Sequence, residues 1–231
     1  MKIDLSDWRN QFVGKQAGTD NDVIITAMAR WIDGRAITFV MPSPSSLMLN
    51  AAFSAYERAL TARGHVQVIT EDKLIRNTSD VYDYVQSYFE STIFAFTSIE
   101  VTCNLHIQKE HELVVEGSKS TETYRGEQIE RWVHLDDKIE FVANTLGSSI
   151  DKSTGTWNRY KSLSKNRDRL IHLKNSDRES HNPDEDKVWA IALQPNPINP
   201  CEVAIEVLNL LYARKKKPDW LKAANEFIQS T

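Results

Sequence analysis

The amino-acid sequence predicts a mainly α protein, in which a helical bundle follows a small α+β unit that carries a β-hairpin. Two long stretches, residues 77–107 and 123–146, place apolar side chains at the three- and four-residue spacing of amphipathic helices. Residues 23–41 are rich in branched and aromatic side chains around Asp33 and Gly34, a pair typical of hairpin turns. Hydrophobic residues make up 41% of the chain and charged residues 26%, which is ordinary for a globular protein and excludes a disordered one.

We place the α+β unit at residues 1–76. After the hairpin, the prolines and serines of residues 42–46 end the second strand and offer caps for a helix. Four apolar positions of that helix recur at helical spacing: Leu49, Phe53, Tyr56 and Leu60. Gly64 ends the helix, and the alternation of Val66 and Val68 indicates a third strand.

The bundle is expected to occupy residues 77–231, with the helix of residues 77–107 at its centre. Residues 108–125 are polar, and we expect the run 117–121 within them to form an exposed loop. We expect the helix of residues 123–146 to be irregular near Asp136 and Asp137. The elements that follow are a helix at 157–174, a loop at 175–186, an extended piece or helical turn at 188–193, a helix from Pro200 and a tail helix at 220–228. The basic run 214–217 indicates either the C-terminal turn of the helix before it or a phosphate contact.

Charge is distributed unevenly along the chain. The net charge is −4, yet residues 152–178 hold eight basic and two acidic side chains. Such clustering indicates either a local anion or phosphate site or a solvated helix face. The chain has two cysteines in no paired spacing, no apolar run long enough to span a membrane and no secretory signal pattern at its start. We therefore expect a soluble, cytoplasmic protein with reduced thiols and no membrane partner.

The helix of residues 157–174 carries the candidate site. On an ideal helix Arg167 falls in the middle of the apolar stripe formed by residues such as Tyr160, while Asp168 and His172 lie on its border and Arg169 faces away. A guanidinium that points to the core keeps its charge and needs an acceptor. Glu100, on the central helix, is the acid that we expect to pair with Arg167.

Two polar residues of the central helix accompany this pattern. Glu100 and Asn104 lie one turn apart, so they share a face beside the apolar stripe. They mark either the solvent edge of the helix or a polar pocket inside the bundle.

The string Arg167, Asp168, three variable residues and His172, placed late in a helical domain, resembles the motif of the HEPN superfamily. The likeness covers roughly residues 77–215 and includes the earlier helix that ends with residues 98–104. Many members of that superfamily are dimeric helical bundles that cleave RNA without a metal ion in toxin–antitoxin, phage-defence and CRISPR systems, and others are inactive binding modules. The resemblance implies that Arg167 and His172 are catalytic, with Asp168 between them and Glu100 and Asn104 in support.

The motif and the basic segment together predict an enzyme that acts on RNA. We expect a metal-independent endoribonuclease that needs no cofactor, with RNA as substrate and an antitoxin or defence protein as a partner. The cations expected to bind RNA are Lys161, Lys165, Arg169 and Lys174. Arg167 and His172 are about 140° apart on one helix, so we expect a homodimer in which two copies form one composite site. The alternative is an inactive HEPN-like dimer that binds nucleic acid, nucleotide or protein, in which His172 is a border residue and Arg167 a structural ion-pair partner.

Overall fold

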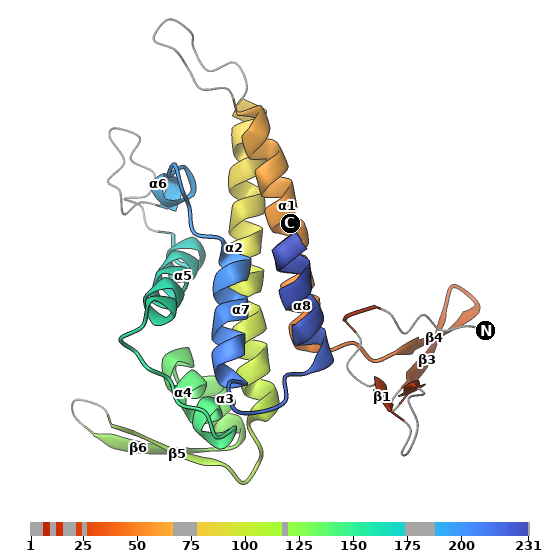
Figure 1. Ribbon diagram of the computed structural model, residues 1–231, viewed down its shortest axis with the longest axis vertical. Coiled ribbons are helices and arrows are strands. Elements are labelled where there is room, and N and C mark those ends of the chain that lie inside the picture. Colours follow the sequence, from red (N-terminus) through yellow and green to blue (C-terminus); the bar gives the residue numbers. More distant parts are fainter. Residues whose placement is uncertain are drawn as a thin grey trace, which may run out of the picture.

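The computed structural model of the protein describes residues 7–9, 13–15, 22–24, 27–66, 78–116, 120–173 and 188–230. Within these ranges the chain forms eight helices and three two-stranded antiparallel hairpins, so the fold is mainly α, as the sequence predicts (Figure 1). No helix in the described ranges combines the length and the hydropathy needed to cross a membrane.

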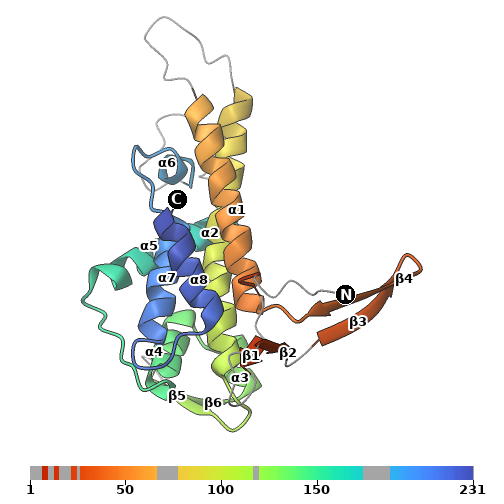
Figure 2. The same cartoon turned by 45° about the vertical axis from the view of Figure 1, so that its right-hand side comes forward.

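The long helix α2 (Thr78–His106) is the central element, and α1 (Pro44–His65) runs along it (Figures 1 and 2). The start of α1 is fixed by Ser43, whose hydroxyl accepts a hydrogen bond from a backbone N–H in the first turn. Leu49 and Phe53 of α1 belong to the same core cluster as Ile99 of α2. That core therefore lies across the domain boundary expected at residue 76, and by its packing α1 is a member of the bundle.

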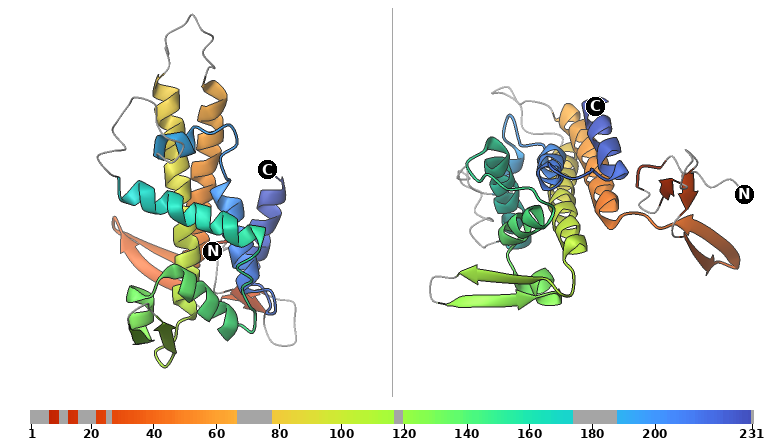
Figure 3. Two further views of the ribbon diagram at one scale, coloured as in Figure 1. Left: turned by 90° about the vertical axis from the view of Figure 1, so that its left-hand side faces the viewer. Right: turned by 60° about the horizontal axis from the view of Figure 1, so that its bottom comes forward.

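Shorter helices complete the bundle. They are α3 (Glu127–Trp132), α4 (Leu135–Thr145), α5 (Gly155–Ile171), α6 (Val188–Ala192), α7 (Pro200–Leu211) and α8 (Asp219–Ser230). Helix α7 is rich in apolar residues, and its Leu208 and Leu211 are fully buried in the core. Helix α5 crosses over α2 on one face of the bundle (Figure 3). Of the residues expected as an extended piece or a helical turn at 188–193, residues 188–192 form the helix α6.

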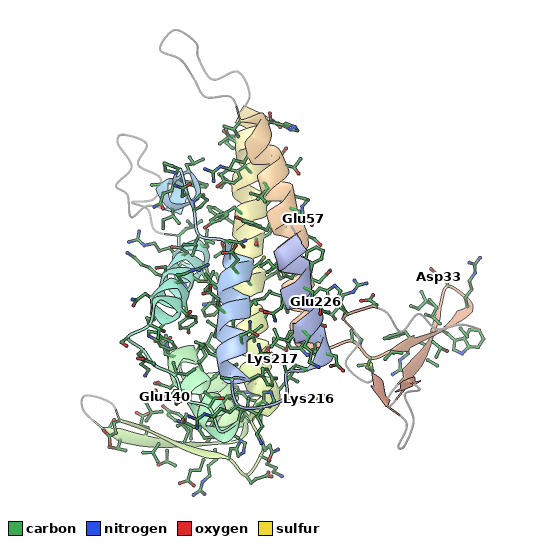
Figure 4. The ribbon with its side chains drawn as sticks, viewed as in Figure 1. Asp33, Glu57, Glu140, Lys216, Lys217 and Glu226 are labelled. Atoms are coloured by element: carbon green, nitrogen blue, oxygen red, sulfur yellow. The ribbon has the colours of Figure 1, made fainter. Side chains whose placement is uncertain are left out.

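The N-terminal hairpin is confirmed. Strand β3 (Ala27–Ile32) pairs with β4 (Arg35–Val40), and the turn residues Asp33 and Gly34 have positive φ angles of 50° and 75°. The hairpin projects from the bundle with Asp33 at its tip (Figures 2 and 4). A further pair of strands in the described part of this region is β1 (Val13–Lys15) with β2 (Asp22–Ile24).

Between α2 and α5 the structure contains a hairpin that the sequence does not predict, and one expected helix is divided. Residues 117–119 of the expected loop lie outside the described residues. Residues 108–125 contain a hairpin, β5 (Glu112–Glu116) with β6 (Thr121–Arg125), because Leu113, Val115 and Tyr124 pack against the bundle core. The helix expected at 123–146 begins later and is split into α3 and α4. The split falls at residues 133–134, where His134 caps α4 and two aspartates begin its first turn, beside the irregularity that the sequence indicates.

The basic run 214–217 follows α7 instead of closing it. Helix α7 ends at Leu211, and its last turn holds no basic residue. Lys216 and Lys217 lie in the connection to α8, at the end of the bundle (Figure 4). The backbone N–H of Arg214 donates to the hydroxyl of Ser148, so this connection is fastened to the segment between α4 and α5.

Gly126 is the position between β6 and α3 where only glycine fits. Its φ angle is +45°, and a Cβ atom built there would lie 2.8 Å from the carbonyl oxygen of Lys109. We expect Gly126→Ala to lower the free energy of unfolding by about 1–3 kcal/mol, because both backbone strain and a steric clash are introduced.

The matched control is Gly155→Ala, in the first turn of α5, where an added Cβ meets nothing within 4 Å. Urea unfolding should show that this variant is at least as stable as the wild type, because alanine restricts the unfolded chain. Equal stability of the two alanine variants would contradict the constraint at Gly126.

Candidate active site

Helix α5 positions the candidate residues. Thr154 caps the helix by accepting a hydrogen bond from the Trp157 backbone N–H. On one side of the helix, Tyr160 and Leu163 are completely buried. The apolar stripe weakens toward the C-terminus, where Ile171 is 46% exposed. His172 is the C-terminal cap, held by a 3.0 Å hydrogen bond from its backbone N–H to the Asp168 carbonyl oxygen, and its side chain is exposed.

Arg167 points to the bundle but does not pair with Glu100. Its guanidinium lies 4.8 Å from the centre of the Phe96 ring on α2, and its Nη1 donates to Asp168 Oδ1 at 2.9 Å. The side chain is 28% exposed, and the Asp168 carboxylate takes the place that we expected Glu100 to fill, with the Phe96 ring as a second contact.

Glu100 and Asn104 have a different partner, Lys138 of α4. The ammonium of Lys138 donates to Asn104 Oδ1 at 3.2 Å and to the Glu130 carbonyl oxygen, and it lies 3.8 Å from Glu100 Oε1. The Lys138 side chain is only 2% exposed, and this burial lowers its pKa while Glu100 raises it. Glu100 and Asn104 therefore share one buried cation, and this polar contact joins α2, α3 and α4.

A groove of about 390 Å³ runs along the flank of α5. Six residues of this segment line it: Lys161, Ser164, Lys165, Asp168, Arg169 and His172. The seventh lining residue, His134, comes from the junction of α3 and α4. We call this feature the α5 groove. It brings together two histidines and three cations, which is the combination that a phosphate-binding and proton-transferring site needs.

The α5 groove includes most of the residues that the sequence singles out. Asp168, Arg169 and His172 lie in it together, although we expected Arg169 to face away. The reason is that the groove lies on the flank of α5 and not over the bundle core, so the side of the helix opposite the core is part of it. Arg167 is not among the lining residues, and Lys174 lies outside the described residues.

Asp136, in the first turn of α4, fixes the edge of the groove. Its Oδ1 accepts a hydrogen bond from the Tyr160 hydroxyl at 2.8 Å, and its Oδ2 pairs with the Lys161 ammonium. Burial raises the pKa of the Asp136 carboxyl, but the hydrogen bonds from Lys161 and Tyr160 outweigh burial and hold that pKa below its ordinary value. Burial, reinforced by Asp136, raises the pKa of Tyr160, which therefore remains a hydrogen-bond donor.

Sequence reasoning missed His134 and Lys138. Lys138 lies three residues after Leu135 and four before Val142, within the apolar face of α4, which is an unusual place for a lysine. His134 precedes two aspartates, and acidic residues are typical of the first turn of a helix. That pattern places a helix start, and hence a cap, at His134.

A larger groove of about 570 Å³ lies between α1 and α2. Its charged and titratable lining side chains are Glu57, Arg58, His65, Asp80, Asp83 and Glu90. Carboxylates are in the majority there and repel phosphate, so the α5 groove is the better candidate for an anionic substrate.

Comparisons of the chain with protein-family models, with curated proteins and with solved structures give no match. Among the residues that the structure describes, no three or more His, Cys, Asp or Glu side chains cluster closely enough to hold a metal ion. The candidate site is therefore defined by the geometry of the α5 groove, and the likeness to HEPN proteins rests on the sequence motif.

The pairing of Asp136 predicts a specific dependence of stability on pH. Because the folded-state pKa of Asp136 lies below its ordinary value of 3.8, the stabilisation is complete above that value and is lost as the pH falls through the folded-state pKa. We expect Asp136→Asn to lower the free energy of unfolding by about 2 kcal/mol at pH 7, where a charged acceptor is lost.

The difference between wild type and Asp136→Asn should shrink as the pH is lowered from 7 to 3 in urea unfolding experiments. Asp137→Asn is the matched control, because it removes the same charge from the same helical turn without a Tyr160 or Lys161 partner in the structure. A constant difference across this pH range would show that the Asp136 charge does not hold α4 to α5.

Proposed function

We propose that the chain is a metal-independent endoribonuclease and that the α5 groove is its active site. The observation that carries this proposal is the position of His172, an exposed imidazole that shares a groove with Lys161, Lys165 and Arg169. The resemblance of Arg167, Asp168 and His172 to the HEPN motif supports the same activity.

The chemistry of RNA cleavage fits these groups. Attack by the ribose 2′-hydroxyl on the adjacent phosphorus requires a base for the hydroxyl proton, and an imidazole exchanges protons near neutral pH. Cations around the phosphate stabilise the negative charge of the pentacoordinate transition state. Arg169 provides a forked donor for phosphate oxygens, and Lys165 provides a compact charge.

Arg167 acts in this proposal as a positioning residue within one protomer. It contacts Asp168, which lines the α5 groove, and it stacks on Phe96. Arg167 thus joins the groove wall to the central helix, and it reduces the negative charge that Asp168 presents to a phosphate.

We also propose a homodimer with the motif at or near its interface. Arg167 and His172 leave α5 about 140° apart, so one copy of the helix does not direct both groups at the same phosphate, whereas two copies that meet along this helix would. Exposed apolar side chains flank His172, with Ile171 46% and Leu173 56% exposed, and such residues are typical of interfaces. The toxin–antitoxin or antiviral setting, with a protein partner, is part of the same proposal and rests on the HEPN resemblance alone.

A second candidate is a catalytically silent helical dimer that binds nucleic acid, nucleotide or protein. The observation that favours it is the position of Arg167, which pairs with Asp168 and Phe96 and does not line the groove that contains His172. In that case the cations of the α5 groove bind a phosphate without cleaving it.

Cleavage of total RNA by the purified protein in EDTA tests the enzyme against the binding module. We expect His172→Gln to lower kcat by about 10²–10⁴, because the proton-transfer group is lost. His65→Gln, at the end of α1, is the matched histidine control and should cleave at the wild-type rate. RNA left intact at every protein concentration, or equal cleavage by a folded His172→Gln variant, would exclude the proposed enzyme.

The salt dependence of RNA binding tests the cations of the groove. For single strands, the slope of log Kobs against log salt concentration changes by about 0.7 for each phosphate contact. We expect Lys165→Gln and Arg169→Gln each to reduce the slope by about this amount in fluorescence anisotropy titrations. Lys222→Gln, on the exposed side of α8 with Asp219 as its partner, should leave the slope unchanged. If all three variants kept the wild-type slope, RNA would have to bind outside the α5 groove.

A further inference from the structure

His134 is held at the α5 groove by the start of α4. It is the N-terminal cap of that helix, and its Nδ1 accepts a hydrogen bond from the Asp136 backbone N–H at 3.3 Å. The first turn of α4 is in turn fastened to α5, because Asp136 binds Tyr160 and Lys161. The imidazole is therefore positioned by two hydrogen-bonded links although its side chain is 62% exposed.

The contacts of His134 Nδ1 determine whether the other ring nitrogen, Nε2, carries a hydrogen. In the neutral ring, Nδ1 accepts from the Asp136 backbone, so the hydrogen is on Nε2. In the protonated ring both nitrogens carry a hydrogen, and Nδ1 lies 3.6 Å from Asp136 Oδ1. The protonated ring is the form that can give its Nε2 proton to a leaving group, and the proton that stays on Nδ1 then faces the Asp136 carboxylate.

The described groups that share the groove or an ion-pair distance with His134 belong to α4 and to the α5 segment. On α4 it faces Asp136, and across the groove it faces the α5 residues Lys161, Lys165, Asp168, Arg169 and His172. A phosphodiester that enters the groove therefore meets an imidazole at the end of α5, a second imidazole from the α3–α4 junction and three cations of α5.

We infer that His134 is the second proton-transfer residue of this site and that it protonates the leaving 5′-oxygen of RNA. The inference rests on the proposed function. His172 takes the proton of the 2′-hydroxyl while the bond between the 2′-oxygen and phosphorus forms. His134 gives a proton to the 5′-oxygen as the bond from phosphorus to that oxygen breaks. The products are a 2′,3′-cyclic phosphate and a free 5′-hydroxyl, and the two histidines end with exchanged protonation states.

The substitution that tests this role is His134→Asn. Asparagine is a strong N-terminal cap and accepts the same backbone hydrogen bond, but it transfers no proton. His134→Ser, another capping residue, is a second variant, and urea unfolding of both shows that α4 remains capped. If a variant keeps the wild-type stability and cleaves RNA more slowly, the loss comes from proton transfer and not from capping.

Cleavage of two substrates distinguishes the loss of the proton donor from the loss of the base. The first is a short RNA, whose 5′-alkoxide needs a proton to leave, and the second is uridine 3′-(4-nitrophenyl phosphate), whose nitrophenolate leaves without one. We expect His134→Asn to lower kcat on RNA by about 10²–10⁴ and to cleave the nitrophenyl ester at nearly the wild-type rate. His172→Gln should lose activity on both substrates.

The pH profile gives an independent measure. Wild-type kcat/KM on RNA should be bell-shaped, because one imidazole must be neutral and the other protonated. We expect His134→Asn to lose the fall in rate on the alkaline side, since the proton donor controls that limb.

The possible results are distinguishable. Wild-type cleavage of RNA by His134→Asn, or an equal loss on both substrates, would overturn the role of His134 and leave the ribonuclease proposal intact. Failure of the wild-type protein to cleave either substrate would overturn the ribonuclease proposal and the role of His134 with it.

Discussion

The carboxylate of Asp136 is the contact on which the candidate site depends. It lies at the start of α4 and binds both Tyr160 and Lys161 of α5, so it joins two segments that are more than twenty residues apart in the sequence. This contact holds the start of α4, and with it His134, against the flank of α5, next to the core that Leu135 and Tyr160 share. A second contact links α4 to the central helix, because Lys138 binds Glu100 and Asn104.

Much of the fold could be predicted because local patterns agree with the final packing. The helices α1, α2, α5, α7 and α8 follow from apolar periodicity, and the β3–β4 hairpin follows from Asp33 and Gly34. The hairpin of β5 and β6 could not be predicted in this way, because each strand has five residues and many are charged or polar. Its stability comes from a tertiary contact, the packing of Leu113, Val115 and Tyr124 on the core. The position of α1 was missed for the same reason, since only packing assigns it to the bundle.

The candidate site was predictable where it depends on one helix and not where it depends on two. The direction of Arg167 toward the bundle followed from the rotation of α5, but its neighbour Phe96 and the pairing of Glu100 with Lys138 required the packed structure. His134 comes from a junction that the sequence presented as the interior of one long helix. The cations at positions 161, 165 and 169 lie along one side of α5. They line a groove because the α3–α4 junction, with His134, lies beside them, and a single helix does not reveal that neighbour.

The central claim is that this groove cleaves RNA by attack of the 2′-hydroxyl. The measurement that tests it most directly is the chemical nature of the ends produced when the purified protein cuts a defined RNA in EDTA. We predict 2′,3′-cyclic phosphate and 5′-hydroxyl ends, and no cleavage when the nucleotide before the cut carries a 2′-deoxyribose. Ends with a 5′-phosphate, or cleavage at the deoxyribose, would contradict the claim.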